Sequence, residues 1–336
     1  MRAPEFWGPS GTNHPAACLL APLAAFYRAA GAVRSALVHP SRAAVPVICV
    51  GNIVAGGAGK TPTALALGRL VRELGGNAHF LTRGYGGRER GPLRVNPKRH
   101  DADAVGDEAL LLAAEAPTWL SADRVAGAGA AVTSGADLII MDDGLQNPSL
   151  AKDISFVVID GGFGFGNGHV LPAGPLREPV TRGLARADAI VVIGPDTASM
   201  TEALRAAPAP VFAAELVPGP EALRFRDRPL VAFAGIGRPA KFFETLQAIG
   251  AVLVERHSFA DHHRYTPDEI MRLCDAASRH GGKPVTTAKD YVRLPPEARL
   301  MVDVLSVALE WREPLALSAL IAPLVMRARL GASDRG

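Results

Sequence analysis

The sequence predicts an α/β fold with a doubly wound, mostly parallel sheet and a second, smaller α/β lobe. Two observations predict it. Short apolar segments rich in valine, isoleucine and leucine alternate with helical segments, which is the pattern of a parallel sheet covered by helices on both faces. A glycine-rich segment at residues 50–63, VGNIVAGGAGKTPT, joins an apolar strand to a helix, as phosphate-binding loops do.

The composition bounds the class of protein. The chain has 336 residues, which is enough for two domains, and is 48% hydrophobic and 21% charged, so it can bury a core and is not disordered. A net charge of +3 gives no reason to expect nucleic acid as a partner. The three cysteines are far apart and form no CxxC pair, which indicates a reducing compartment without disulfides or a zinc knuckle.

The N-terminal region is apolar and contains no Asp or Glu between Glu5 and Glu73. The apolar segment Ala16–Tyr27 is interrupted by Pro22 and followed by Arg28, so we expect it to be too short and broken to span a bilayer. At helical spacing the apolar side chains form one stripe, edged by arginine. This pattern leaves two interpretations open, a helix lying in a membrane surface or an amphipathic helix docked on the core. The stripe consists of Leu19, Leu23, Phe26, Ala30, Val33 and Leu37.

The next part of the chain, residues 41–215, is predicted to form the larger domain, with residues 310–336 as a candidate completion of it. Its expected strands are Val45–Val50, Ala78–Thr82, Asp137–Met141, Ser155–Ile159 and Ala189–Ile193, and its expected helices are Thr63–Leu74 and Asp107–Ala116.

A smaller α/β lobe is predicted at residues 216–309, after a proline-rich connection at residues 206–229. A closing helix is expected at Pro314–Leu330, and Val302–Leu309 is either the last strand of this lobe or a strand that returns to the larger domain. The expected strands of the lobe are Leu230–Ala234, Ala251–Arg256 and Pro284–Thr287, and its expected helices are Pro239–Ile249 and Pro267–His280.

The glycine-rich loop predicts a nucleotide site and a P-loop NTPase-like fold. Gly56, Gly57 and Gly59 allow backbone N–H groups to turn toward phosphate oxygens, beside the N-terminus of the next helix. Lys60 is expected to reach the β- and γ-phosphates, and the Thr61 hydroxyl to ligate Mg²⁺. The general motif G-x-x-x-x-G-K-[ST] is not met, because its first glycine would fall on residue 54, which is valine.

Acidic side chains follow two further segments. Asp142 and Asp143 end an apolar strand, where a P-loop enzyme needs a carboxylate near its magnesium ion. Asp107 precedes a helix and has two possible roles, an N-cap or the base that accepts a proton from the acceptor hydroxyl.

The segment HSFADHHRYTPDE at residues 257–269 crowds histidines and aspartates into one predicted loop. Adjacent histidines cannot easily ligate one ion, so zinc is disfavoured, and the alternatives are an Asp–His pair for proton transfer or a polar turn. Three further loops also end strands or lie between elements, where sites are built: LTRGYGG (81–87), LPAGPLREP (171–179) and TTAKDYVRLP (286–295).

Seven segments, taken in order, resemble the tetraacyldisaccharide 4'-kinases, the inner-membrane lipid kinases of lipid A assembly in Gram-negative bacteria. They are GNIVAGGAGKTP, RGYGG, GDE, DDGLQ, LPAGPLREP, ADHH and TTAKD, within residues 40–295. The Gly-Gly-x-Gly-Lys-Thr-Pro loop belongs to that family pattern, so Val54 departs only from the general P-loop. Ala109 stands where the family pattern has proline after Gly-Asp-Glu, and both carboxylates are kept.

The resemblance implies transfer of the γ-phosphate of ATP to the 4'-hydroxyl of a tetraacylated glucosamine disaccharide 1-phosphate, with ATP and Mg²⁺ as cofactors. It implies that Asp107 and His262 form an acid–base pair at the acceptor, His262 being chosen over His263 because it directly follows Asp261. The nucleotide would lie on Val54, Ala55, Gly56, Gly57, Ala58, Gly59, Lys60 and Thr61, and the metal near Thr61, Asp142 and Asp143. Contacts to the substrate or transition state are expected from Arg83, Tyr85, Gln146, Arg177, Glu178 and Asp261.

The same resemblance favours the membrane-surface interpretation for residues 1–40, since a kinase with a four-chain lipid acceptor must meet it at the bilayer. The expected partners are the acylated disaccharide lipid and the inner-membrane surface, with the enzyme peripheral on its cytoplasmic face, without nucleic acid or an obligate protein partner. Because Asp107 and His262 fall in different lobes, we expect the lobes to close on each other when ATP binds.

Two alternatives stay open from the residues alone. One is a soluble P-loop small-molecule kinase or ligase, which would bury the N-terminal stripe. The other is a non-enzymatic, membrane-recruited nucleotide switch, which would need no acceptor base at residue 107.

Overall fold

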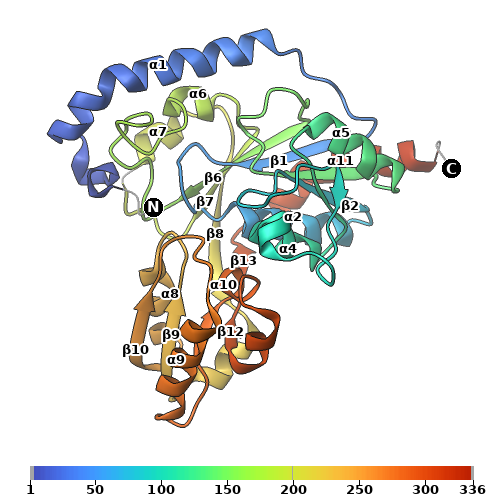
Figure 1. The fold of residues 1–336 in the computed structure, drawn as a ribbon. Coiled ribbons are helices and arrows are strands. Elements are labelled where there is room, and N and C mark those ends of the chain that lie inside the picture. Colours follow the sequence, from blue (N-terminus) through green and yellow to red (C-terminus); the bar gives the residue numbers. More distant parts are fainter. Residues whose placement is uncertain (1–3, 199, 334–336) are drawn as a thin grey trace.

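The computed structural model describes residues 4–198 and 200–333 and is built on two sheets (Figure 1). The larger sheet has nine strands, and its six central strands, from β7 to β4, run parallel. β8 pairs parallel with β7, whereas β13 and β3 add antiparallel strands at the two edges. Across the sheet the strands are β13 (Val307–Trp311), β8 (Val211–Pro218), β7 (Ala189–Ile193), β6 (Ile154–Asp160), β1 (Val47–Gly51), β5 (Leu138–Asp142), β2 (Ala78–Thr82), β4 (Thr118–Leu120) and β3 (Leu93–Arg94).

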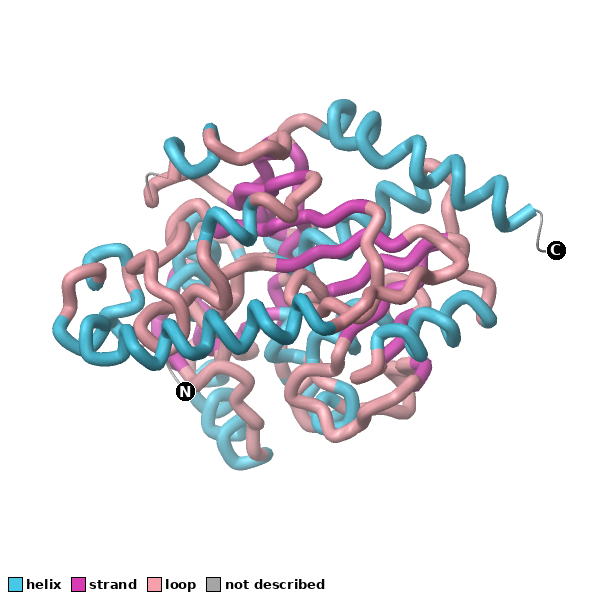
Figure 2. The backbone as a smooth tube through the Cα atoms, turned by 90° about the horizontal axis from the view of Figure 1, so that it is seen from above, coloured by secondary structure: helices cyan, strands magenta, loops and turns pink. Residues whose placement is uncertain are grey.

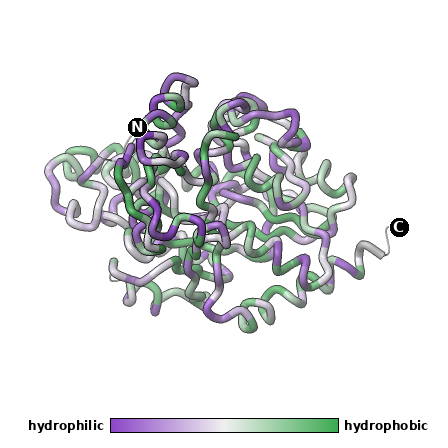
Figure 3. The backbone as a smooth tube through the Cα atoms, turned by 90° about the horizontal axis from the view of Figure 1, so that it is seen from below, coloured by the Kyte–Doolittle hydropathy of each residue, from purple (hydrophilic) through white to green (hydrophobic). Residues whose placement is uncertain are grey.

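Helices cover both faces of this sheet, which confirms the predicted doubly wound α/β class. α2 (Lys60–Glu73) and α11 (Pro314–Ser333) pack on one face, and α5 (Arg124–Thr133) and α6 (Val180–Leu184) on the other. The central strands are buried along their length and are hydrophobic over most of it, as expected of strands covered on both faces (Figure 3). Short helices α3 (Ala102–Val105), α4 (Asp107–Ala113) and α7 (Thr201–Arg205) lie in the connections. We call this sheet with its helices the large lobe.

The second sheet has four parallel strands and forms the small lobe with α8, α9 and α10, at the bottom of Figure 1. β10 lies at one edge, and β9 and β11 are central. Its elements are β9 (Pro229–Ala234), α8 (Pro239–Ala248), β10 (Val252–Ser258), α9 (Pro267–Ser278), β11 (Val285–Thr287), α10 (Ala288–Tyr291) and β12 (Asp303–Leu305), with 3₁₀ turns at Pro220–Phe225 and Pro296–Met301.

The two passages between the lobes differ from the sequence prediction. The five strands predicted for the large lobe lie within two residues of β1, β2, β5, β6 and β7. Residues 206–229, predicted as a connection, instead contain β8, an eight-residue strand of the large sheet. Residues 302–309 were predicted to form either the last strand of the small lobe or a strand returning to the large lobe, and they contribute to both. β12 is the edge strand of the small sheet, and β13 then pairs with β8 in the large sheet. Two strands therefore join the lobes at one edge of the large sheet.

The N-terminal helix α1 (Pro15–Leu37) lies along the large lobe on the side away from the small lobe (Figures 1 and 2). Its predicted apolar stripe faces solvent: Leu19 is 82% exposed and Phe26 is 71% exposed. Only Ala17 and Ala24 of this helix are buried. Docking of the stripe on the core is therefore wrong. 3₁₀ turns at Glu5–Trp7 and Pro9–Gly11 lead into the helix.

The prediction that this segment is too short and too broken to span a bilayer is also wrong. α1 has 23 residues, about 34 Å at 1.5 Å per residue, and Pro22 lies inside it without ending it. By length and composition alone, two helices of the described chain, Pro15–Leu37 and Pro314–Gly331, could cross a membrane. The second packs Leu317, Ile321 and other residues into the core, so α1 is the helix that is free to meet a lipid surface.

Candidate active site

The glycine-rich loop leaves the end of β1 and enters the first turn of α2. Gly56 and Gly59 have φ angles of 119° and 89°, which side-chain-bearing residues rarely adopt. The side-chain Nδ2 of Asn52 donates to the carbonyl oxygens of Val54 (2.6 Å) and Gly56 (3.4 Å), and Asn52 is fully buried. Asn52 therefore braces the loop where the general motif relies on a first glycine.

Lys60 and Thr61 begin α2 and face two acids at the end of β5. The Thr61 hydroxyl donates to Oδ2 of Asp142 at 3.0 Å. The Lys60 ammonium lies 3.7 Å from Oδ1 of Asp143, and Arg177 Nη1 donates to that same oxygen at 2.8 Å. The two neighbouring carboxylates thus have different partners: Asp143 neutralises two cations, whereas Asp142 pairs with a hydroxyl.

Asp142 is fully buried, and burial, together with the nearby carboxylate of Glu108, raises its pKa to about 7, against the opposing charge of Lys60. Its Oδ1 has no hydrogen-bond partner, which is costly for a buried carboxylate oxygen. A cation at this oxygen would relieve both penalties.

The donor set suits magnesium. Carboxylate and hydroxyl oxygens are ligands that Mg²⁺ accepts, and this ion usually takes only one or two protein carboxylates beside phosphate and water oxygens. Within residues 4–198 and 200–333 no group of three His, Cys, Asp or Glu side chains could hold a metal ion by itself. The residues therefore fit a magnesium ion that arrives with a nucleotide better than a metal held by protein ligands alone.

Asp107 and His262 meet across the lobes. Asp107 is the first residue of α4 in the large lobe, and His262 lies in the loop after β10 in the small lobe. The His262 Nδ1 and Asp107 Oδ2 atoms are 3.1 Å apart. The contact exists in the structure as it stands, so no further closure is needed to bring the pair together. The N-cap of α4 is Gly106, so the alternative that Asp107 caps this helix is wrong.

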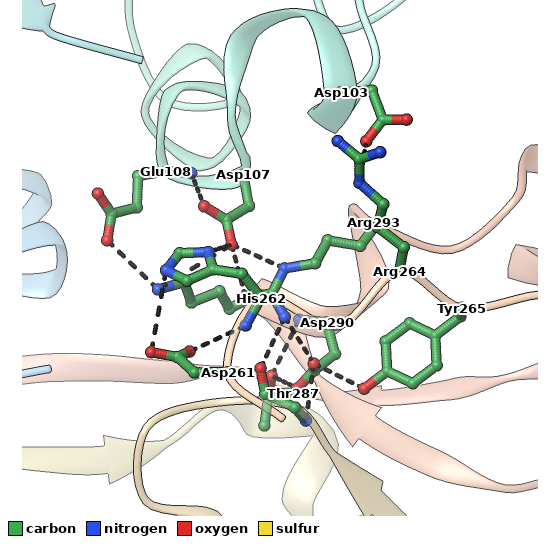
Figure 4. A network of polar contacts seen from close by, with 12 residues as sticks. Asp103, Asp107, Glu108, Asp261, His262, Arg264, Tyr265, Thr287, Asp290 and Arg293 are labelled. Carbon is green, nitrogen blue, oxygen red and sulfur yellow. Dashed lines mark hydrogen bonds and ion pairs between the residues drawn. The ribbon is translucent and has the colours of Figure 1, made fainter. Parts of the chain in front are cut away.

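Basic side chains of the small lobe surround Asp107 (Figure 4). Arg293 Nε donates to its Oδ2 at 2.7 Å, and the Lys289 ammonium lies 4.0 Å from that oxygen and 3.3 Å from Glu108 Oε1. Although burial acts to raise the pKa of Asp107, the hydrogen bond from His262 and the charges of Lys289 and Arg293 hold it well below its usual range. Asp107 is therefore a fixed, ionised carboxylate.

Of the remaining sequence-predicted residues, all but Arg83 fall into two groups. Arg177 also donates to Gln146 Oε1 at 3.3 Å, and Gln146 Nε2 donates to Glu178 Oε1 at 2.9 Å, so these three form one network beside the glycine-rich loop. Tyr85 and Asp261 lie beside His262. The ring centroids of Tyr85 and His262 are 5.4 Å apart, and Asp261 Oδ2 is 3.9 Å from His262 Nε2. Arg83 is exposed just after β2. His263 contacts Glu269 rather than Asp107.

Several inter-lobe contacts were not found by sequence reasoning. Arg293 contacts Asp107, and Arg264 pairs with Asp103 of α3. Arg238, after β9, donates to Asp160 at the end of β6 (3.0 Å) and to the carbonyl of Gly57 in the glycine-rich loop (3.3 Å). Lys241 also pairs with Asp160. A cavity of about 300 Å³ opens beside the Asp107–His262 contact and is lined by both lobes. The site therefore gathers a glycine-rich loop, an acidic strand end and an Asp–His pair at the junction of the lobes.

Comparison with known proteins identifies this arrangement. A family model described as LpxK, tetraacyldisaccharide-1-P 4'-kinase, matches residues 16–325. The tetraacyldisaccharide 4'-kinase of Paramagnetospirillum magneticum is 54% identical over 330 residues, covering 98% of this chain and 100% of that protein. The protein of the same name from Rhodospirillum rubrum is 52% identical over 329 residues, covering 97% and 98% of the two chains.

A solved structure is similar over nearly the whole chain. It is the crystal structure of an apo form of LpxK from Aquifex aeolicus in complex with ATP, which superposes with a TM-score of 0.72 at 26% sequence identity. The match covers 92% of this chain and 99% of that one.

Proposed function

The chain belongs to the tetraacyldisaccharide 4'-kinase family and is a phosphotransferase of lipid A biosynthesis, and we propose that it performs the transfer at the junction of its two lobes. The observation that carries this proposal is the 3.1 Å contact between Asp107 and His262, beside the glycine-rich loop. Family membership decides against the two alternatives left by the residues alone, a soluble small-molecule kinase and a non-enzymatic switch.

ATP is proposed to bind with its phosphates in the loop from Val54 to Thr61. The positive φ angles of Gly56 and Gly59 support this position, because they turn backbone N–H groups toward one concave side. Lys60 would move from Asp143 to the β- and γ-phosphates. Arg177, which also pairs with Asp143, would stabilise the negative charge that develops on the transferred phosphoryl group. The complex of ATP with the Aquifex aeolicus relative supports the nucleotide assignment.

The residues proposed to hold magnesium are Thr61, through its hydroxyl, and Asp142, whose Oδ1 has no partner. Bound there, it would neutralise charge on the phosphates. Asp143 is proposed to act one step further away, by orienting Lys60 and Arg177.

The acceptor is proposed to enter the cavity beside Asp107 and His262, where the pair takes the proton of the 4'-hydroxyl as its oxygen attacks the γ-phosphorus. Most of the catalysis is then positioning and electrostatic stabilisation, since phosphoryl transfer asks for little covalent chemistry from the protein. Tyr85 and Asp261, which flank the histidine, are proposed to contact the sugar, with Arg83, Gln146 and Glu178 as further candidates for contacts with substrate or the transition state.

The enzyme is proposed to act at the cytoplasmic face of the inner membrane, held there by the exposed stripe of α1. Leu19, Phe26 and Leu37 are among the most exposed apolar side chains in the chain, and the helix carries arginines and no acid. Such a helix binds a lipid surface by burying its apolar face and attracting anionic headgroups to its basic residues.

The test of the proposed site is phosphoryl transfer from ATP to detergent-solubilised disaccharide 1-phosphate lipid. The wild type should form the bisphosphorylated lipid, and Asp107→Ala should lower kcat by about 10²- to 10⁴-fold with ATP binding retained. Asp275→Ala is the matched control, because this carboxylate is exposed on α9 and does not line the cavity. Equal activity of the Asp107 and Asp275 variants would remove Asp107 from the mechanism.

A further inference from the structure

Arg293 is a buried cation between two carboxylates of different lobes. Arg293 follows α10 in the small lobe, and its side chain is 5% exposed. Nε donates to Asp107 of the large lobe at 2.7 Å, and Nη1 donates to Asp290 of the small lobe at 3.0 Å. Figure 4 shows the guanidinium lying between the two acids. A buried guanidinium that bridges two lobes in this way needs both carboxylates to balance its charge.

Asp290 fixes the far end of this bridge. It is fully buried and, besides Arg293, accepts hydrogen bonds from the Gly235 N–H (2.9 Å), the Tyr265 hydroxyl (2.8 Å) and the Thr287 hydroxyl (2.6 Å). Four donors on one buried carboxylate leave it little freedom to move. Arg293 therefore has a rigid support in the small lobe.

The same guanidinium also reaches the backbone that carries His262. Nη1 donates to the carbonyl oxygen of Gly235 at 2.7 Å, and the backbone N–H of His262 donates to that same oxygen at 3.1 Å. His262 has a φ of 57°, which is uncommon for a residue with a side chain and must be held by its surroundings. One side chain thus contacts the carboxylate of the pair directly and shares an acceptor with the backbone of the histidine.

The charges around the pair are arranged by both lobes. Lys289 and Arg293 approach Asp107 from the small lobe and Glu108 follows it on its own helix, while Asp261 and the ring of Tyr85 flank His262. Asp107 is 3% exposed and both of its oxygens are occupied, Oδ1 by the N–H of Glu108. His262 is the more open member of the pair, with a side chain that is 30% exposed.

We propose that Arg293 is a positioning residue of the transfer reaction. It holds Asp107 ionised and in place against His262, and it keeps the two lobes in a fixed orientation relative to each other. The inference rests on the proposed role of Asp107 and His262 and adds a residue to it. With Asp107 anchored, Nδ1–H of His262 donates to the carboxylate and Nε2 is left to take the proton. The 4'-oxygen loses its proton to Nε2 as it bonds to the γ-phosphorus, and the bond from phosphorus to the bridging oxygen breaks to release ADP.

The test compares Arg293→Gln, Arg293→Lys and the matched surface control Arg279→Gln, an exposed arginine of the small lobe. Arg293→Gln should lower kcat about 10- to 100-fold with the KM for ATP within about twofold, because misalignment of a reacting pair costs this much. It should also move the acid limb of the kcat–pH profile to higher pH, since loss of the cation favours the protonated form of Asp107. A residue with only a structural role would not shift this limb.

Arg293→Lys keeps the charge but cannot reach Asp107 and Gly235 together. It should retain the wild-type acid limb while losing about three- to tenfold in kcat. Thermal unfolding and ATP binding establish that each variant folds. If Arg293→Gln does not fold, the Lys variant decides: wild-type kcat would overturn the proposal, as would wild-type kcat and pH profile in a folded Gln variant.

Asp107→Asn, measured in parallel, separates this inference from the proposed function. Full activity of Asp107→Asn would mean that the pair itself is wrong. An inactive Asp107→Asn beside a normal Arg293→Gln would leave the pair intact and overturn only the role of Arg293.

Discussion

The exposed stripe of α1 gives a prediction that can be worked from the structure. Leu19 and Phe26 are 82% and 71% exposed, so replacing both by serine should change the free energy of unfolding by less than about 0.5 kcal/mol, as at ordinary surface sites. On a membrane the same side chains would be buried. Complete burial of a Leu or Phe side chain is worth about 1.5–3 kcal/mol. Since only the exposed part of each side chain is left to bury, the double variant should lose about 2–5 kcal/mol of lipid-binding free energy.

This loss corresponds to a roughly 30- to 4,000-fold weaker partitioning onto vesicles, at 1.4 kcal/mol per factor of ten. The assay is co-sedimentation with vesicles that contain anionic lipid, with thermal unfolding of the same samples. The matched control is Leu315→Ser with Met326→Ser on α11, which are 84% and 65% exposed and should leave vesicle binding unchanged. Unchanged partitioning of the α1 variant, or a large drop in its melting temperature, would refute the reasoning.

Three further predictions concern the site. Burial raises the pKa of Asp142 to about 7, so without magnesium the folded protein keeps a proton that the unfolded chain releases near pH 4. The free energy of unfolding therefore falls as the pH rises from about 4 to about 7. In chelator at a pH above 7, Asp142→Asn should have a higher melting temperature than the wild type, while phosphoryl transfer is abolished. Asn52→Ala removes the brace under the glycine-rich loop, and isothermal titration should show weaker ATP binding by about tenfold, with an unaltered value contradicting that role. Arg238→Ala should raise the KM for ATP through the contact with Gly57, and an unchanged KM in steady-state assays would argue against it.

The parts of the fold that sequence predicted are those determined locally. β1, the glycine-rich loop and the start of α2 follow one another in the chain, and the residue types alone specify a buried strand, a turn of positive φ and a helix start. The acids after β5 are likewise fixed by the strand before them.

The errors have physical reasons. β8 lies among prolines and has exposed residues along half its length, since it is near the sheet edge, so its sequence resembles a linker. Pro22 does not break α1 because it sits on the exposed side, where a carbonyl without its N–H partner can be hydrated. Arg293 could not be assigned from sequence, because its role depends on contact with a carboxylate 186 positions away.

The account depends most on Asp107 and His262 acting as one unit across the lobes. A double-mutant cycle of single-turnover transfer with Asp107→Asn, His262→Ala and both together tests this directly. If the two side chains share one task, the double variant should be no slower than the slower single variant, because effects of residues that act as a unit do not add. Rate losses that multiply in the double variant would mean that the two residues act independently, and would contradict the account.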